Sequence, residues 1–291
     1  MSLSLDRRDV GTIRRRRNAR AILRTATSRV ILIVLSALLL VPLWWMFVTA
    51  VKTDHELVAF PPTLWPQQWK WVNFTIAVSS VPFFIYLRNT VIITIFTVLG
   101  AVISNPLIAY GFSRIDWPGR DRLFLIVLAT VFIPFPVLLV PLFDLFSRVH
   151  WINTFLPLIV PVFFGNAFWI FLMRQFLLQI PGDLSDSARI DGANEFQVFS
   201  RVVLPLTLPA IGAIAIFAFI FAWNDFLGPL IYLQDSSHYT LAIGLTFFHS
   251  EHNVRLNLLM AASTLVILPV VVVFIIFQRF FIEGVTLGSI R

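Results

Sequence analysis

Six long runs without a charged residue constrain this chain more than any other feature of its sequence. A helix needs roughly 20 apolar residues to cross the hydrocarbon core of a bilayer, which is about 30 Å thick. The runs are Val30–Val51, Asn89–Ser113, Leu123–Phe143, Trp151–Met173, Val202–Asn224 and Leu256–Gln278. Each run is long enough, so the sequence predicts an all-α integral membrane protein with six transmembrane helices.

The composition excludes an ordinary soluble domain and several kinds of site. Hydrophobic residues make up 58% of the 291 residues, and charged residues only 13%, which is unusual for a water-soluble fold. The chain contains no cysteine, which excludes disulfides, thiolate nucleophiles and Cys-ligated zinc. His249 and His252 flank Glu251, but this spacing alone is a weak indication of a metal site. We therefore expect no bound metal.

Proline and aromatic residues modify the simple pattern of spans. The segment Trp71–Leu87 is short for a span and contains Asn73 and Pro82, so we expect an interfacial element outside the membrane. Prolines within a span remove backbone donors and interrupt the helix, and broken helices often line a transport pathway. In the third and fourth spans these prolines are Pro134, Pro136, Pro141, Pro157 and Pro161.

The distribution of Lys and Arg predicts the orientation in the cell membrane. With both termini in the cytoplasm, only Lys52, Lys70, Arg88, Arg148 and Arg255 of the 22 basic residues lie outside, as the positive-inside rule requires. The arginine-rich leader suits anionic lipid beside the first span better than nucleic acid. The expected divisions are a cytoplasmic basic segment (1–29), the transmembrane domain (30–282), external loops (52–88 and 234–255), a cytoplasmic loop (180–205) and a cytoplasmic tail (283–291).

The cytoplasmic loop is more polar than most of the chain, and its pattern predicts two helices. Asp183 can cap a first short helix that has Asp186 in its first turn, and Gly192 then breaks that helix. Asn194 and Gln197 have the spacing of a capping box, which predicts the start of a second helix. The second helix would present one apolar face made of Phe196, Phe199 and Val203. These residues alone fit a docking surface or a plain connector on the membrane.

The same loop resembles a family signature. ABC importer permeases carry a Glu-Ala-Ala triplet, a glycine four positions after its last alanine, and a later Leu-Pro pair. Here the triplet is Asp186, Ser187 and Ala188, the glycine is Gly192, and Leu204 precedes Pro205. The segments "RNTVIITIFTVLGAVISNPLIAYGFSRIDWPGRD", "FIFAWNDFLGPLIYL" and "FQRFFIEGVTLGSI" are also similar to carbohydrate-importer permeases, in particular to the shorter permease of maltose-type systems.

This resemblance implies a type I ABC importer permease fold and a set of partners. The expected partners are a second homologous permease, two ATPase subunits that bind ATP and Mg, an extracytoplasmic solute-binding protein and membrane lipid. The loop would dock on the ATPase, with Asp186 as acidic contact, Ala188 as the point of close packing and Gly192 as the turn. The expected coupling residues are Asp186, Ser187, Ala188, Arg189, Asp191, Gly192, Ala193 and Phe196. No cofactor is expected on this chain.

A candidate substrate pathway lies at the end of the fifth predicted span. Asp225 follows Pro209 by 16 residues, or about 24 Å of helix, and a carboxylate at such a depth normally faces a cavity or the bundle interior. Trp223, Asn224 and Asp225 together offer an aromatic face and hydroxyl-binding groups for a sugar. Alternatively, Asn224 and Asp225 hold neighbouring helices together.

Transport is favoured over catalysis. The chain has no GxxxxGK[ST], GxSxG or HExxH motif, so no catalytic residue is expected and ATP hydrolysis is assigned to a partner. The expected function is import of a sugar or oligosaccharide. The alternatives are a permease for a glycerophosphodiester or polyamine and, more remotely, a membrane enzyme using Asp183, Asp186 and Asp191 as acid-base groups.

Overall fold

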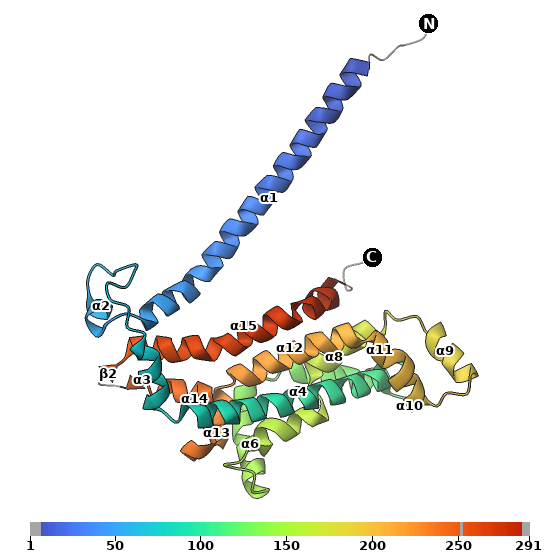
Figure 1. The fold of residues 1–291 in the computed structure, drawn as a ribbon. Coiled ribbons are helices and arrows are strands. Elements are labelled where there is room, and N and C mark those ends of the chain that lie inside the picture. Colours follow the sequence, from blue (N-terminus) through green and yellow to red (C-terminus); the bar gives the residue numbers. More distant parts are fainter. Residues whose placement is uncertain (1–6, 251–252, 287–291) are drawn as a thin grey trace.

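The computed structural model describes residues 7–250 and 253–286, and helices dominate the fold (Figure 1). In chain order they are α1 (Arg7–Ala50), α2 (Asp54–Val58), α3 (Val72–Ser80), α4 (Phe83–Ser113), α5 (Arg120–Ala129), η1 (Thr130–Phe132), α6 (Phe135–Arg148), α7 (Leu156–Ile159), η2 (Val160–Phe164), α8 (Ala167–Leu177), α9 (Asp183–Ile190), α10 (Glu195–Gln197), η3 (Val198–Val203), α11 (Leu204–Leu206), α12 (Leu208–Asn224), α13 (Leu227–Tyr232), η4 (Ser236–His238), α14 (Leu241–Thr246) and α15 (Leu256–Thr286). Strands β1 (His249–Ser250) and β2 (Asn253–Val254) pair antiparallel. The all-α prediction is therefore confirmed apart from this short hairpin.

The number of spans agrees with the prediction when bent helices are counted. Thr25–Ala50, Phe83–Ser113, Leu156–Leu177 and Leu256–Gln278 are long and apolar enough to cross a membrane. Two further pairs of helices meet the same criterion but are bent, Arg120–Phe132 with Phe135–Arg148 and Glu195–Leu206 with Leu208–Asn224. Counting each bent pair as one span gives 6 spans in the described residues.

Proline explains the sharper of the two bends. Pro134 lacks a backbone N–H and disfavours a helical conformation in the residue before it, and Ile133 is extended, with φ −80° and ψ 113°. The helix therefore turns by 101° at this point. The second bend, of 77°, lies at Thr207 between two prolines. The predicted spans Leu123–Phe143 and Val202–Asn224 are therefore each divided into two helices, and the interruption of the third span by proline is confirmed.

Another proline divides the predicted interfacial element Trp71–Leu87. The chain leaves α3 at Val81, which is extended, and Pro82 precedes the first turn of α4. The residues from Phe83 onward belong to α4, so this span begins before the predicted start at Asn89.

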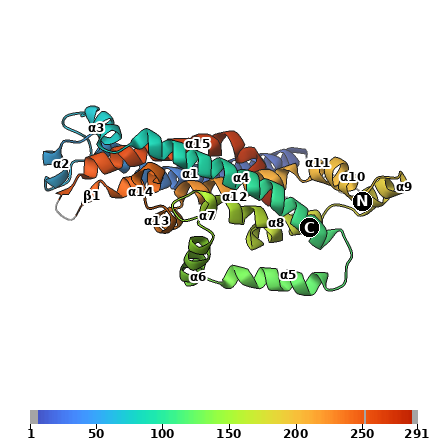
Figure 2. The ribbon, with the colours of Figure 1, turned by 90° about the horizontal axis from the view of Figure 1, so that it is seen from below.

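Small residues let the central helices pack closely. Figures 1 and 2 show α4, α12 and α15 running alongside one another. The main core cluster joins α4, α8, α12 and η3, and Met173 and Ile214 at its centre have no exposed surface. Ala101, Ala109 and Ala218 are likewise fully buried. Small side chains at helix contacts allow the backbones to approach, which is the usual basis of packing in membrane bundles.

Buried asparagine side chains tie separate elements together. The Asn89 amide in α4 donates to the carbonyl of Ser237 at 2.8 Å and to that of Tyr239 at 3.0 Å. The Asn105 side-chain oxygen accepts a hydrogen bond from the backbone N–H of Asn166 at 2.9 Å. The Asn89 bonds hold the segment around Tyr239 to α4. The Asn105 bond satisfies a backbone group at a break within a predicted span, which is required where water is absent.

Helix α1 leaves the body beside α2 and α3 (Figure 1). Among the side chains described for α1, residues 25–50, the buried ones lie at its end and include Val48 and Ala50. By contrast, the large apolar side chains from Val30 to Val41 are each at least 48% exposed. A helix that is apolar all round requires lipid or another protein around it.

Gly165 offers a test of the packing at the start of α8. Its φ is +92°, and an added Cβ would lie 2.6 Å from Ile108 Cδ1 and 3.0 Å from Ile170 Cδ1. Gly165→Ala is therefore expected to destabilise the fold by about 1–3 kcal/mol, measured as a lower thermal midpoint by size-exclusion chromatography in detergent. Gly111→Ala in α4 is the control, because nothing lies within 4 Å of its added Cβ. Equal midpoints for the two variants would contradict this account.

Candidate functional site

The polar loop, residues 180–205, lies at the end of the body farthest from α2 and α3 (Figures 1 and 2). Its first helix, α9, begins after Gly182, and no side chain caps that end. The predicted cap by Asp183 is therefore wrong. Asp183 and Asp186 instead occupy the first turn, where carboxylates face the positive end of the helix dipole. Gly192 has φ +89°, which confirms the predicted glycine turn, because side chains other than glycine rarely adopt that conformation.

The second helix of the polar loop starts as predicted and then widens. The Asn194 side chain accepts from the N–H of Gln197, and Gln197 accepts from the N–H of Asn194, both at 2.9 Å. This confirms the capping box. The helix continues as a π-helix, η3, whose wider turn changes the spacing of side chains on one face. Of the three residues predicted to form one apolar face, Phe199 and Val203 are buried, whereas Phe196, in the short turn ahead of η3, is 70% exposed.

A network of hydrogen bonds joins the polar loop to α4. Across the Gly192 turn, Arg189 Nε donates to Glu195 Oε1 at 2.7 Å, and Arg189 Nη1 donates to Asp186 Oδ1 at 2.7 Å. The hydroxyl of Tyr110 in α4 donates to Glu195 Oε2 at 2.8 Å. The hydrogen bond from Arg189 holds the pKa of Glu195 below its ordinary value, against the opposing effect of burial. The two loop helices are thus fastened to each other and to the bundle.

The predicted coupling residues differ in what they present to the outside of the loop. Ala188 and Ala193 are half-buried and pack against the core, and Arg189 is engaged in ion pairs. The exposed members are Asp186, Ser187, Arg189, Asp191, Gly192 and Phe196.

Sequence reasoning missed two side chains of this loop. Glu195 is bonded to Tyr110, which lies 85 positions away, and no local pattern indicates such a contact. Ile190 is 86% exposed at the end of α9. The signal for Ile190 was present, because it is a lone apolar residue between charged Arg189 and Asp191. Exposed apolar side chains gathered on one loop are typical of a protein contact surface.

The C-terminal ends of α4 and α8, next to the polar loop, are joined by hydrogen bonds from arginine side chains. The Arg114 guanidinium at the end of α4 donates to the carbonyls of Leu177 and Ile180, and Arg174 Nε in α8 donates to the Phe112 carbonyl at 3.1 Å. Arginine can satisfy helix C-terminal carbonyls in this way. The start of the polar loop is therefore held in place by hydrogen bonds to the ends of α4 and α8.

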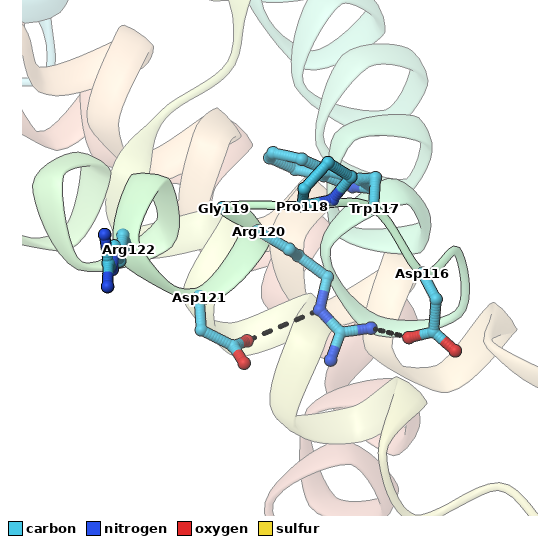
Figure 3. A pocket seen from close by; sticks show the side chains of 7 residues that line it. All are labelled: Asp116, Trp117, Pro118, Gly119, Arg120, Asp121 and Arg122. Atoms are coloured by element: carbon cyan, nitrogen blue, oxygen red, sulfur yellow. Dashed lines mark hydrogen bonds and ion pairs between the residues drawn. The ribbon is translucent and has the colours of Figure 1, made fainter.

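The loop between α4 and α5 forms an open concavity of about 530 Å³, lined by residues 116–122 (Figure 3). Figure 3 shows Arg120 reaching two carboxylates, at 2.6 Å from Asp116 and 3.4 Å from Asp121, while Arg122 stands apart. Exposed ion pairs of this kind contribute little to stability. Arg174 also lies 3.4 Å from Asp121, so two guanidinium groups pair with the two carboxylates, and we interpret this region as a connecting loop.

The three predicted pathway residues do not face a common space. The Trp223 indole N–H donates to the Val266 carbonyl at 3.1 Å, so this ring turns toward α15. The exposed Asn224 amide donates to the Ile220 carbonyl of its own helix at 2.8 Å. Asp225 alone lines a cavity of about 250 Å³, and its Oδ1 accepts from the Gly228 N–H at 3.1 Å. The structure therefore does not bring Trp223, Asn224 and Asp225 together at one site.

The Asp225 cavity, as we name this space, lies where interrupted helices meet. Its walls come from α6, α7, η2, α8, α12 and α13. The aromatic and polar side chains that line it are Phe135, Phe146, Asn166, Trp169, Phe221 and Tyr232. Tyr232 is only 2% exposed, and its hydroxyl has no hydrogen-bond partner among the described residues. Aromatic walls with a few polar groups are typical of ligand pockets.

The described residues contain no group of 3 or more His, Cys, Asp and Glu side chains placed to hold a metal ion. Glu251 and His252 lie outside those residues, and the His249 side chain is likewise not described. The expectation that the chain binds no metal or cofactor stays a prediction.

Comparison with known proteins places the chain in a transport family. The family described as binding-protein-dependent transport system inner membrane component matches residues 101–286. The chain belongs to this family. It is also 34% identical over 260 residues to the arabinooligosaccharides transport system permease protein AraQ of Bacillus subtilis, covering 88% of this chain and 92% of AraQ. The diacetylchitobiose uptake system permease protein NgcG of Streptomyces coelicolor is 30% identical, covering 91% of this chain and 89% of NgcG.

A solved structure supports the fold. A chain of a bacterial ABC transporter involved in the import of the acidic polysaccharide alginate superposes with a TM-score of 0.76 at 22% identity, covering 89% of this chain and 96% of that chain. The predicted importer-permease fold and family are thus confirmed. With its long apolar helices, this family member is a multi-pass membrane protein and a transport component.

The network around Glu195 predicts how firmly the polar loop is held. Glu195→Gln removes the charge that pairs with Arg189, so we expect faster hydrogen exchange at the amides of α9 and the Gly192 turn, by about tenfold if the loss is ~1.4 kcal/mol. The measurement is hydrogen-exchange mass spectrometry in nanodiscs. Asp191→Asn, which removes an exposed carboxylate outside the network, is the control. Equal exchange in both variants would show that the network does not hold the loop.

Proposed function

We propose that this chain is a permease subunit of an ABC importer that carries a sugar or oligosaccharide into the cell. The observation that carries the cargo class is the match over 88% of the chain to a permease named for arabinooligosaccharide transport. The similarity to a diacetylchitobiose permease points the same way. A glycerophosphodiester or polyamine cargo is the alternative.

The polar loop is the proposed contact with a separate ATPase subunit that binds ATP and Mg. It exposes Ile190 and Phe196 beside Asp186, so it offers an apolar contact with an acidic group next to it. The half-buried Ala188 allows close packing, and Gly192 supplies the turn. Because Arg189 is occupied by Glu195 and Asp186, its role is to hold the loop's shape rather than to contact the ATPase directly.

The proposed orientation follows from the basic residues. The polar loop and the C-terminal ends of α4 and α15 lie toward the same end of the body (Figures 1 and 2). Arg114 is bonded there to the Ile180 carbonyl, and Arg174 to the Phe112 carbonyl near the end of α4. The positive-inside rule assigns this end to the cytoplasm. The opposite end, with α2, α3 and α14, then faces outward, where a solute-binding protein would deliver cargo. The family's description as binding-protein-dependent supports this partner.

A second permease completes the proposed transporter. The exposed apolar side chains between Val30 and Val41 in α1 leave a large surface for another membrane protein or for lipid. One chain of this size would supply half of a pathway, and a homologous subunit would supply the other half.

The first experiment is purification of the tagged chain in mild detergent, with mass spectrometry of the proteins that co-purify and an ATPase assay. We expect a second permease and an ATPase, with hydrolysis stimulated by a sugar-loaded binding protein. A screen of sugars and polar non-sugar solutes against that binding protein then identifies the cargo. Stimulation by a glycerophosphodiester or polyamine alone would overturn the sugar assignment, and a partnerless chain would overturn the importer assignment.

The Gly192 turn predicts a variant that uncouples hydrolysis from transport. Gly192→Val places a β-branched residue at φ +89°, which is strained whatever the surrounding space. We expect at least a tenfold loss of uptake per ATP hydrolysed, from a strain of about 1–3 kcal/mol that distorts the loop, while membrane insertion stays normal. Gly182→Ala is the matched control, because an added Cβ there meets nothing within 4 Å and no positive φ is involved. Normal coupled uptake by Gly192→Val would count against the docking role.

The exposed apolar residues of the polar loop predict that a charge placed among them weakens binding of the ATPase. Ile190→Asp introduces a charge into the proposed ATPase contact, and burying an unpaired charge is costly. We expect the ATPase to be lost from the purified complex while the second permease is retained. Leu184→Asp, at a half-exposed position on the same helix, serves to map the edge of the contact. Retention of the ATPase by Ile190→Asp would exclude Ile190 from the interface.

A further inference from the structure

The Asp225 cavity contains one buried polar group that has no partner in the described part of the fold. The Tyr232 hydroxyl is buried without a hydrogen-bond partner among the described residues, which costs free energy comparable to a lost hydrogen bond. Asp225 lines the same cavity as Tyr232, and no hydrogen bond joins the two side chains in the described residues. No basic side chain in the described part of the chain is within ion-pair distance of Asp225.

The cavity also has a third polar group and aromatic surfaces. The Asn166 side-chain oxygen accepts from the N–H groups of Phe168 and Trp169, at 3.0 Å and 3.3 Å, which leaves its NH₂ group as the donor on that side chain. Trp169, Phe146 and Phe221 supply ring surfaces around these groups. Hydrogen-bonding groups combined with aromatic surface fit a ligand that has both hydroxyls and an apolar face.

The surrounding backbone has the form of a binding region. The cavity lies between α6, which follows the bend at Pro134, and the interrupted segment of α7 and η2 that contains Pro157 and Pro161. Discontinuous helices are common at substrate sites of membrane transporters. At about 250 Å³, the space is below the usual range for a drug-sized ligand, so it suits one ring rather than a chain of several.

We propose that the Asp225 cavity binds a single sugar ring of the transported substrate. Two ring hydroxyls donate to the Asp225 carboxylate, and another forms hydrogen bonds with the Tyr232 hydroxyl and the Asn166 NH₂ group. The apolar face of the ring packs on an aromatic side chain of the cavity wall. This inference rests on the proposed sugar-import function and adds Tyr232, Asn166 and Trp169 as specificity-determining residues. The permease then contributes directly to selection of the cargo.

An organic cation is the main competing ligand, because a carboxylate among aromatic rings can also hold an ammonium group. The sugar is favoured by the Tyr232 hydroxyl and the Asn166 NH₂ group. A quaternary ammonium group has no hydrogen-bond donor or acceptor of its own, and choline adds a single hydroxyl, whereas a sugar ring carries several hydroxyls that both donate and accept.

The test uses the assembled transporter in nanodiscs without its binding protein. Binding of tritiated arabinotriose, tritiated diacetylchitobiose and tritiated choline is measured by scintillation proximity. We expect the complex to bind at least one of the two sugars and not choline. Asp225→Asn keeps an oxygen for the Gly228 N–H, and Tyr232→Phe keeps the ring. Each variant should weaken sugar binding by about tenfold, the loss expected for one good hydrogen bond.

Matched substitutions outside the cavity control for general effects. Asp144→Asn changes a carboxylate whose side chain is 61% exposed, and Tyr239→Phe removes a hydroxyl that is bonded to the Gln234 carbonyl at 3.1 Å. Both should bind sugar as the unchanged complex does. The amount of assembled complex is recorded for every variant, and Tyr232→Phe carries the test if Asp225→Asn reduces assembly.

The outcomes separate this site from the proposed function. Uptake of either sugar into vesicles is measured in parallel with the binding protein present. Uptake combined with unchanged sugar binding in both cavity variants overturns the site alone. Choline binding that is lost in Asp225→Asn overturns the sugar assignment in favour of a cation. Absence of uptake for sugars that the binding protein carries overturns the importer function, and the cavity site falls with it.

Discussion

The backbone N–H of Asn166 donates to the Asn105 side-chain oxygen at 2.9 Å. This hydrogen bond holds the break before α8 against α4, and the arrangement of the interrupted helices depends on it. Water is absent from a bilayer core, so each break in a helix must be satisfied by protein groups. Asn105 meets this requirement from within the unbroken α4. Asn166 then caps α8 through its own side chain. Together, the Asn105 bond and the Asn166 cap allow α8 to begin directly after the break at η2, and they fix one wall of the Asp225 cavity.

The packed central helices and the interrupted segments therefore have different structural roles. The long helices α4, α12 and α15 form a close-packed body in which alanines permit short distances between backbones. The interrupted segments α6, α7 and η2 line the cavity together with α8, α12 and α13. A bundle of straight helices would fill its interior with side chains. Here the bends leave space, and the buried polar groups make that space suitable for a polar ligand.

The polar loop and the cavity are connected through rigid structure. Glu195 joins the loop to Tyr110 of α4, and Val198 and Val203 of η3 belong to the same core cluster as Ile214 of α12. Helix α12 starts just after the loop and ends at Asn224, next to Asp225. A displacement of the loop would therefore be transmitted through packed helices to the residues at the cavity, because close-packed cores transmit strain rather than absorb it.

Local features of this protein were determined by its sequence alone. The apolar runs predicted the number of spans, and the capping box at Asn194 and the turn at Gly192 followed from short-range chemistry. The signature around Asp186 identified the family. Such features depend on neighbouring residues, so a linear pattern is sufficient to find them.

The tertiary structure alone decided which side chains meet. It separated Trp223 and Asn224 from Asp225, brought Tyr232 to the same cavity, and paired Glu195 with Tyr110 across 85 positions. It also bent two predicted spans, because hydrophobic periodicity reports the length of an apolar segment and not its direction. Contacts between distant segments depend on how whole helices pack and where they break, and that information is distributed over the entire chain rather than held in any one motif.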